Sequence, residues 1–322
     1  MITLYDAAGA GLTKRGGGLD VLPSTLWIDL LDPAAAEEDA IEKTLKLDVP
    51  TRAEMREIEA SNRFYQENSA YYMTAFVIYG GDTDNVNTSN VTFILAGTRL
   101  ITVRYGEPKA FPLFAAKACK GDLPVATGAQ IMIGLLEALV QRQADLIERV
   151  QDEVEKLAPQ IFDIKTSRSR GRKLEVILRT IGKEGDIVSR AQESSLSLHR
   201  TLHYFADAAR ERSEDPKLVA RIETAQRDIN SLTDSLRSMS GRVTFLLDAT
   251  LGMISTEQNQ IIKLFSVMSV MLMPPTLVAS VYGMNFKWMP ELDWHLGYPM
   301  AIGLMVISAV IPFIYFRRRG WL

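Results

Sequence analysis

The sequence predicts an α+β membrane protein built from an N-terminal α/β domain, a long helical stalk and two C-terminal transmembrane helices. Short strand-like and helical segments alternate up to about residue 125, and longer stretches with helical spacing follow. Two uncharged apolar stretches then stand near the end of the chain. We therefore divide the chain into residues 1–125, 126–263 and 264–322.

Composition narrows the classes of function. The chain has 322 residues, of which 47% are hydrophobic and 23% charged, as expected for a folded protein. Its net charge of −3 gives no general affinity for nucleic acid. The single cysteine, Cys119, excludes an intramolecular disulfide. Residues 1–21 lack the apolar run of a signal peptide, so we expect most of the mass to be cytoplasmic.

The N-terminal part reads as an α/β domain. Helical segments are expected at Pro33–Leu45 and Thr51–Ile58. Strands are expected at four apolar or alternating segments: Thr25–Leu30, Tyr71–Tyr79, Val91–Leu95 and Leu100–Val103. Gly97-Thr98 between the last two strands predicts a tight hairpin.

The central part reads as a helical stalk. Ala126–Phe162 and Leu174–Ala206 carry apolar residues at helical spacing and predict an antiparallel pair. A third helix begins at Asp215-Pro216, an acidic cap followed by proline at the first helical position. With no strong stop signal before the membrane, one helix of about 100 Å is expected through the first span, and a break at Gly252 is the alternative.

Two segments are long enough to cross a membrane. Leu264–Tyr282 and Tyr298–Phe316 contain no charged residue. The basic cluster Arg317–Arg319 follows the second span and, by the positive-inside rule, lies in the cytoplasm. Both chain ends are then expected in the cytoplasm, with residues 283–297 as an outer loop.

The first span carries a stripe of small or polar residues at a spacing of about 3.5 residues. Its members are Asn259, Ile262, Ser266, Ser269, Met273, Thr276 and Ser280. Such a stripe either packs against another helix or lines a water-filled path, and two spans cannot enclose a path without further subunits. Ile262 and Met273 interrupt the polar residues, so they either close the path as a hydrophobic gate or simply pack.

The spans contain no carboxylate that would compete for the tightly held water of Mg²⁺. Neutral oxygens from Asn259, Ser266, Thr276 and Asn285 are suited to hydrogen-bond with that water and give weak sites. If the stripe lines a path, the absence of carboxylates favours passage of an ion that keeps its water.

Two motifs lie after the first span: Tyr282-Gly283-Met284-Asn285 and Met289-Pro290-Glu291-Leu292. With their place between two spans, they make the chain resemble the CorA-type magnesium transporters, especially the enterobacterial type. The resemblance extends to segments along the whole chain: Trp27–Leu30, Thr51–Ser61, Phe245–Val267 and Pro274–Ser280.

The resemblance implies a homopentameric funnel in the bacterial inner or plasma membrane that takes up Mg²⁺, with Co²⁺ and Ni²⁺ as further cargo. It implies that Gly283, Met284 and Asn285 form the selectivity filter and that Glu291 attracts cations to the mouth. Family members also bind regulatory Mg²⁺ between cytoplasmic domains. Glu223 and Asp228 are candidates for that role, beside the alternative that both are ordinary solvated charges.

Other classes of function are left with little support. His199, His203 and Asp207 share a helical face, but the hydrolytic glutamate of an H-E-x-x-H site is absent, and we expect neither enzymatic activity nor an organic cofactor. A Zn²⁺ transporter of the same superfamily is one alternative. A membrane-anchored metal-binding sensor without ion flux is another. The expected partners are further copies of the chain, lipid and divalent cations.

Overall fold

The computed structural model describes residues 1–9, 11–16, 21, 23–57, 59–80, 86–123, 125–162, 170–285, 287, 289–290 and 293–321. The chain forms two compact units: Met1–Phe162 with Arg179–Leu247, and Asp163–Leu178 with Asp248–Leu322. Its strands are β1 (Ile2–Ala8), β2 (Gly11–Gly16), β3 (Thr25–Leu31), β4 (Phe64–Glu67), β5 (Ala70–Tyr79), β6 (Asn87–Ala96) and β7 (Arg99–Arg104). Its helices are α1 (Ala35–Leu45), the short 3₁₀ helix η1 (Glu54–Arg56), α2 (Ala60–Arg63), α3 (Ala110–Lys120), α4 (Gly128–Phe162), α5 (Arg170–Glu211), α6 (Pro216–Tyr282) and α7 (Gly297–Arg318).

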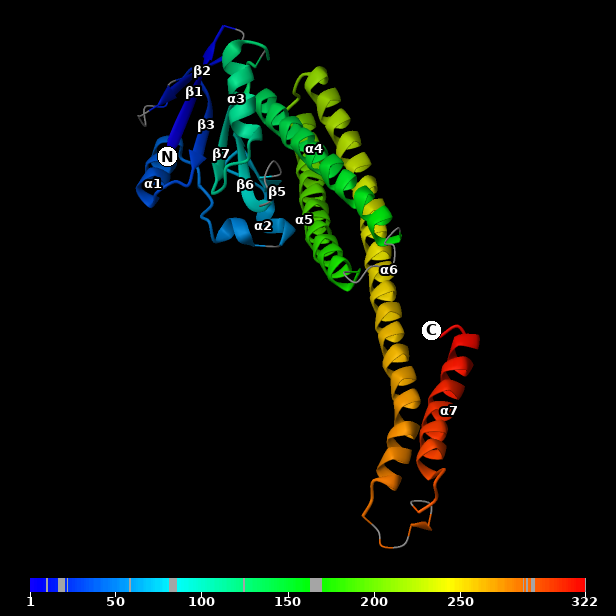
Figure 1. Ribbon diagram of the computed structural model, residues 1–322. Helices are drawn as coiled ribbons and strands as arrows, with labels where there is room; N and C mark the ends of the chain where they lie inside the picture. The colour runs from blue at the N-terminus through cyan, green and yellow to red at the C-terminus, as the bar shows by residue number, and fades with distance from the viewer. Residues whose placement is uncertain are drawn as a thin grey trace. The chain divides into compact units, whose positions relative to one another are not determined.

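The first unit is organised around one seven-stranded sheet (Figure 1). The strand order is β2-β1-β3-β7-β6-β5-β4, and β3 and β7 form its parallel pair. The hairpin between β6 and β7 turns at Gly97, whose φ of 56° is the positive value that such a tight turn needs. The predicted hairpin is therefore confirmed.

The two faces of the sheet are both buried because successive side chains of a strand point to opposite sides. Trp27 and Phe93 belong to a core shared with α3, α4, α5 and the first part of α6. Their neighbours Ile28 and Ile94 belong to a second core on the other face, which α1 and η1 cover. Burial on both faces explains why the sequences of the central strands are almost continuously apolar.

A buried ion pair joins the two parallel strands. The guanidinium of Arg104 donates through Nη2 and Nε to the carboxylate of Asp29, at 2.7 and 2.9 Å, and both side chains are less than 10% exposed. Thr102 donates to the same carboxylate at 2.8 Å and accepts from the indole of Trp27 at 2.9 Å. The network satisfies polar groups that burial alone would penalise.

The free edge of β5 is covered by α5. The hydroxyl of Ser197 accepts a hydrogen bond from the backbone N–H of Phe76 at 2.8 Å, and that of Ser194 accepts from Ile78 at 3.2 Å. Beyond the short pairing with β4, these amides would otherwise face open space. Helix α5 thus protects a sheet edge that would invite pairing with another chain.

Helix α6 is one unbroken helix of 67 residues, from the Asp215 cap through the first apolar span. The side chain of Asp215 accepts from the N–H of Lys217 at 2.9 Å, which confirms the predicted cap. Gly241 and Gly252 both lie inside the helix, so the predicted continuity is confirmed and the break at Gly252 is not observed. At 1.5 Å per residue its length is about 100 Å.

Several elements differ from the sequence-based expectation. The predicted helix at Thr51–Ile58 is reduced to the three residues of η1, and Ile58 lies outside the described residues. Glu54 and Thr51 exchange hydrogen bonds as in a capping box, but Glu57 is already extended. Strands β1, β2 and β4 and helices α2 and α3 were not predicted.

Candidate ion pathway

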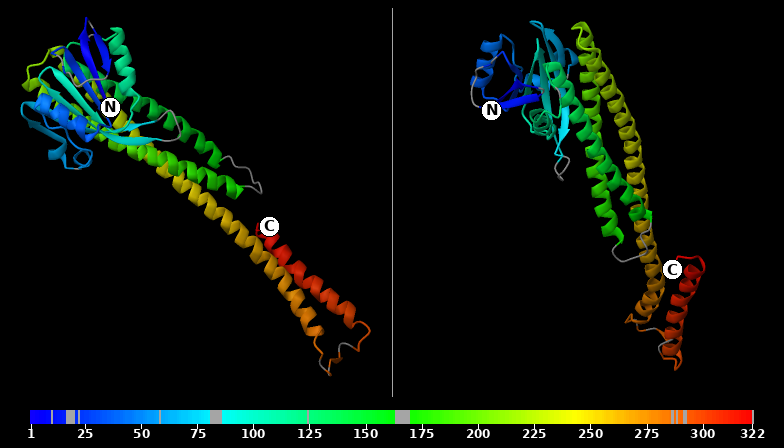
Figure 2. Two further views of the ribbon diagram at one scale, coloured as in Figure 1. Left: turned by 90° about the vertical axis from the view of Figure 1, so that its left-hand side faces the viewer. Right: turned by 90° about the horizontal axis from the view of Figure 1, so that it is seen from above.

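The end of α6 and the whole of α7 form a pair of apolar helices in the second unit. Both contain an 18-residue window apolar enough to cross a membrane, and only 6% of each window is buried. A core helix of a soluble domain would be mostly buried, so these helices fit lipid contact. Figures 1 and 2 show α7 running back alongside the last part of α6.

Helix α7 covers one face of the α6 span. Val267 is fully buried, and the residues following it at helical spacing, Met271, Val278 and Tyr282, are half-buried. On α7, Ala301 is 8% exposed. The covered face of α6 is thus apolar and aromatic.

The predicted stripe lies on the opposite face. Every member of the stripe is exposed, with Ile262 at 61% and Met273 at 70%. At about 100° per residue, Thr276 lies half a turn around the helix from Val267, nine residues earlier. The stripe therefore does not pack against α7, which removes packing inside the chain as its explanation.

Three of the four hydroxyls in the stripe have their protons engaged by the helix itself. Ser266 donates to the carbonyl of Ile262 at 2.8 Å, Ser269 to that of Phe265 at 3.0 Å and Thr276 to that of Leu272 at 2.7 Å. A hydroxyl has one proton and two lone pairs, so each oxygen keeps acceptor capacity toward the outside.

The Gly-Met-Asn residues directly follow the end of helix α6 at Tyr282. The N–H of Gly283 bonds to the carbonyl of Ala279 at 2.9 Å, and that of Met284 to Val281 at 3.3 Å. Met284 is 47% exposed and Asn285 is exposed. A Cβ on Gly283 would lie 3.0 Å from the Ala279 oxygen, closer than a side chain normally tolerates. The last turn has no basic residue, so the partial negative charge of the helix end is left to attract cations.

The opposite end of the hairpin is basic and aromatic. Arg317–Arg319 are exposed, and the guanidinium of Arg319 lies 5.6 Å from the ring centre of Tyr315. The amine of Lys263 lies 5.7 Å from the ring centre of Trp321, so the chain end returns to the level where the α6 span begins. Trp321 was not singled out from the sequence, although tryptophan beside arginine is typical of a membrane interface.

The remaining predicted site residues are not assembled into a metal site within one chain. Glu291 lies outside the described residues. Glu223 and Asp228 are exposed on α6, and the Glu223 carboxylate lies 3.4 Å from Arg210. Asp207 also pairs with Arg210, at 3.1 Å. Across the described parts of the chain, no three His, Cys, Asp or Glu side chains come together in a way that would hold a metal ion.

These features define a class: a membrane protein with a large folded domain, one long helix entering the membrane and a hairpin whose free face is polar. Residues 24–318 match the family described as CorA-like Mg²⁺ transporter protein. The chain therefore belongs to the CorA-like Mg²⁺ transporter family.

Similar proteins agree with this assignment. The chain is 36% identical over 303 residues to the magnesium transport protein CorA of Yersinia pseudotuberculosis, covering 94% of both chains. It is 33% identical over 323 residues to that of Mannheimia succiniciproducens, covering both completely. Its fold resembles the complete CorA structure from Methanocaldococcus jannaschii, with a TM-score of 0.68 at 18% identity over 100% and 99% of the two chains. The full-length CmaX protein gives a TM-score of 0.61 at 15% identity over 100% and 98%.

Proposed function

We propose that this protein mediates Mg²⁺ uptake through a pore lined by the α6 spans of several copies, five as in the CorA-type architecture, and that the ion keeps its water. The observation that carries the proposal is the uncovered polar stripe on the face opposite α7. A polar face left in lipid would be unfavourable, whereas a wet axis shared by several copies solvates it.

The flanks of the stripe support several copies around one axis. Leu272 and Leu277, on either side of the stripe, are 61% and 64% exposed, so both flanks are apolar and uncovered. In a ring of such helices the flanks meet neighbouring spans, the stripe faces the axis and α7 lies outside. Ile262 and Met273 then form apolar rings within the path, which are suited to gate it by excluding water.

At the mouth, Gly283, Met284 and Asn285 form the proposed selectivity filter. Asn285 supplies an amide oxygen at the negative end of α6, and Glu291 in the outer loop raises the local concentration of cations. Arg317–Arg319 mark the cytoplasmic side, with both chain ends there and the protein in the bacterial inner or plasma membrane. Co²⁺ and Ni²⁺ are further proposed cargo. No enzymatic activity is expected. Glu223 and Asp228 stay candidates for regulatory Mg²⁺ held between copies.

The test is Mg²⁺ flux into proteoliposomes, with Co²⁺, Ni²⁺ and Zn²⁺ as competitors. Asn285→Ala removes the proposed filter oxygen and should abolish Mg²⁺ uptake while the oligomer stays intact. Ser308→Ala is the matched control, because Ser308 is half-buried on α7 and its hydroxyl donates to the carbonyl of Met305 at 2.9 Å. Near-normal flux in Asn285→Ala would refute the filter assignment. Absence of flux in the unmodified protein would favour the sensor alternative, and preferred Zn²⁺ flux the Zn²⁺ transporter.

A further inference from the structure

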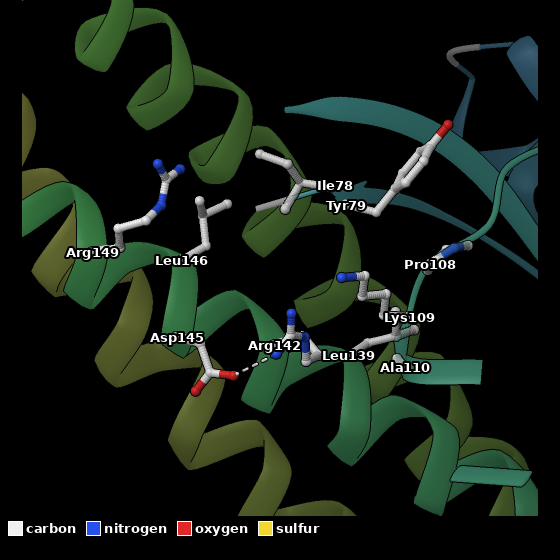
Figure 3. Close-up of a pocket in the computed structure, with 11 residues that line it drawn as sticks. Ile78, Tyr79, Pro108, Lys109, Ala110, Leu139, Arg142, Asp145, Leu146 and Arg149 are labelled. Carbon is white, nitrogen blue, oxygen red and sulfur yellow. Dashed lines mark hydrogen bonds and ion pairs between the residues drawn. The ribbon is translucent and has the colours of Figure 1, made fainter. Parts of the chain in front are cut away.

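A basic pocket lies in the first unit, among residues of β5, α3 and α4. Its walls come from three elements: the end of β5 with Gly80, the start of α3 and one face of α4 (Figure 3). The pocket has a volume of about 130 Å³. The residues that carry its chemistry are Lys109, Arg142, Asp145 and Arg149, and Ile78, Leu139 and Leu146 supply apolar wall.

The charges around this pocket are unbalanced among its lining residues. Lys109, Arg142 and Arg149 are cationic, and Asp145 is the one carboxylate that lines the described pocket. Asp145 lies 3.2 Å from Arg142 and is 53% exposed, so water screens much of its charge. Figure 3 shows the amine of Lys109 and the guanidinium of Arg142 extending into the same space. The lining therefore favours an anion.

Arg149 supplies the most specific indication. Its Nε and Nη2 are buried and have no hydrogen-bond partner in the part of the chain that the structure describes. A guanidinium has only donors, so the missing partner is an acceptor. Leaving such donors buried and unpaired is unfavourable, which indicates an acceptor beyond the described residues.

The backbone adds to the positive potential. Helix α3 begins at the pocket, with Lys109 as its first flanking residue, no acidic residue in its first turn and no side-chain cap. The N–H of Phe111 donates to the carbonyl of Pro108 at 3.0 Å and Pro112 has no N–H, so the helix end adds positive potential rather than free donors.

We propose that this pocket binds a phosphoryl group, either as free phosphate or as the exposed end of a larger molecule. Cations on several sides suit the tetrahedral oxygens of a phosphoryl group better than a planar carboxylate. The volume equals roughly four water molecules at about 30 Å³ each, enough for one phosphoryl group and not for a whole nucleotide. This site is independent of the proposed ion pathway.

One competing source of negative charge is in the sequence itself. Asp82 and Asp84 follow Gly80 closely and lie outside the described residues. If these carboxylates neutralise the pocket, an external anion will not bind until they are removed. The experiment below separates the two cases.

Binding is measured by calorimetry on the full-length protein in detergent at constant ionic strength, with inorganic phosphate and, separately, ATP. Saturable binding is expected, and Arg149→Gln should weaken it by about tenfold or more, the loss of one charge-assisted contact. Asp145→Asn should strengthen it several-fold, because it removes a carboxylate that competes with the anion for Arg142. Arg237→Gln is the matched control, since Arg237 is 79% exposed and lies 3.5 Å from Asp234 on the surface of α6.

The two ligands identify the source of the phosphoryl group: tighter phosphate binding indicates the free ion, and tighter ATP binding a larger molecule. Elution of each variant as the same oligomer shows that it is folded. The proposal is overturned if neither ligand binds, if Arg149→Gln and Arg237→Gln bind equally, or if binding appears only in the Asp82→Asn/Asp84→Asn variant.

Discussion

Replacing Asp29 by asparagine tests how strongly the buried ion pair holds the central sheet. The Asp29 carboxylate accepts two hydrogen bonds from Arg104, at 2.9 and 2.7 Å, and one from Thr102 at 2.8 Å. Asparagine keeps the shape but loses the charge and one acceptor. Because both charged side chains are less than 10% exposed, Arg104 cannot recover its solvation, and the variant should lose about 3–5 kcal/mol of stability.

Hydrogen exchange of the amides of β3 and β7, in the full-length protein in detergent, measures this loss locally. A cost of about 3–5 kcal/mol lowers their protection by roughly two to four orders of magnitude. The double variant Asp29→Leu/Arg104→Met removes both charges and should be less destabilised than Asp29→Asn alone. The reasoning is refuted if Asp29→Asn costs less than about 1 kcal/mol, or if the double variant is the worse of the two.

Three other predictions follow from the described contacts. Ser197→Ala removes the acceptor of the Phe76 amide in β5 and should lower the free energy of unfolding by about 1–3 kcal/mol in a denaturant titration. Ser235→Ala removes an exposed hydroxyl that is bonded to its own helix and should cost less than half as much. Equal losses would contradict the role of Ser197 in covering the sheet edge. Burial lowers the pKa of the His199 imidazole, so the unfolded state binds a proton before the folded state does as the pH falls. The stability of the fold should therefore decrease as the pH drops below about 6.5, the pKa in the unfolded state. If His199→Gln leaves the pH profile unchanged, this histidine is not the cause. Met273→Ala should raise Mg²⁺ leak into proteoliposomes held under closing conditions, while Met268→Ala, 48% exposed but off the stripe, should not; equal leak in both would argue against a gate at Met273.

Much of the fold could be predicted because its strongest signals are local. The apolar strands, the Gly97 turn and the Asp215 cap depend on neighbouring residues, and each is found where expected. The edge strand β2 was missed because Thr13, Lys14 and Arg15 make its text polar, and its place in the sheet depends on pairing with β1. The strand conformation of β2 is determined by its pairing with β1, and such a long-range contact cannot be read from a single sequence.

Helix α3 was missed for a related reason. Its eleven residues include Pro112 in the first turn and are too few for a clear periodic pattern. Its position is set by Phe111 and Phe114, whose rings lie 6.3 and 5.9 Å from that of Trp27 in the core. The basic pocket was missed as well, because its cations come from α3 and α4 and meet only when both pack on the sheet.

The stripe on α6 could be found from the sequence, but its environment required the structure. Spacing alone placed seven residues on one face but could not say whether α7 covers that face, and the fully buried Val267 shows that α7 covers another. Spacing also could not orient the hydroxyls. Because Ser266, Ser269 and Thr276 spend their protons on their own helix, they offer only lone pairs outward. Water bound to a cation points its hydrogens away from the ion and matches such acceptors, whereas an anion would need donors. The outward lone pairs of these three hydroxyls therefore support the proposal that the stripe faces a hydrated cation.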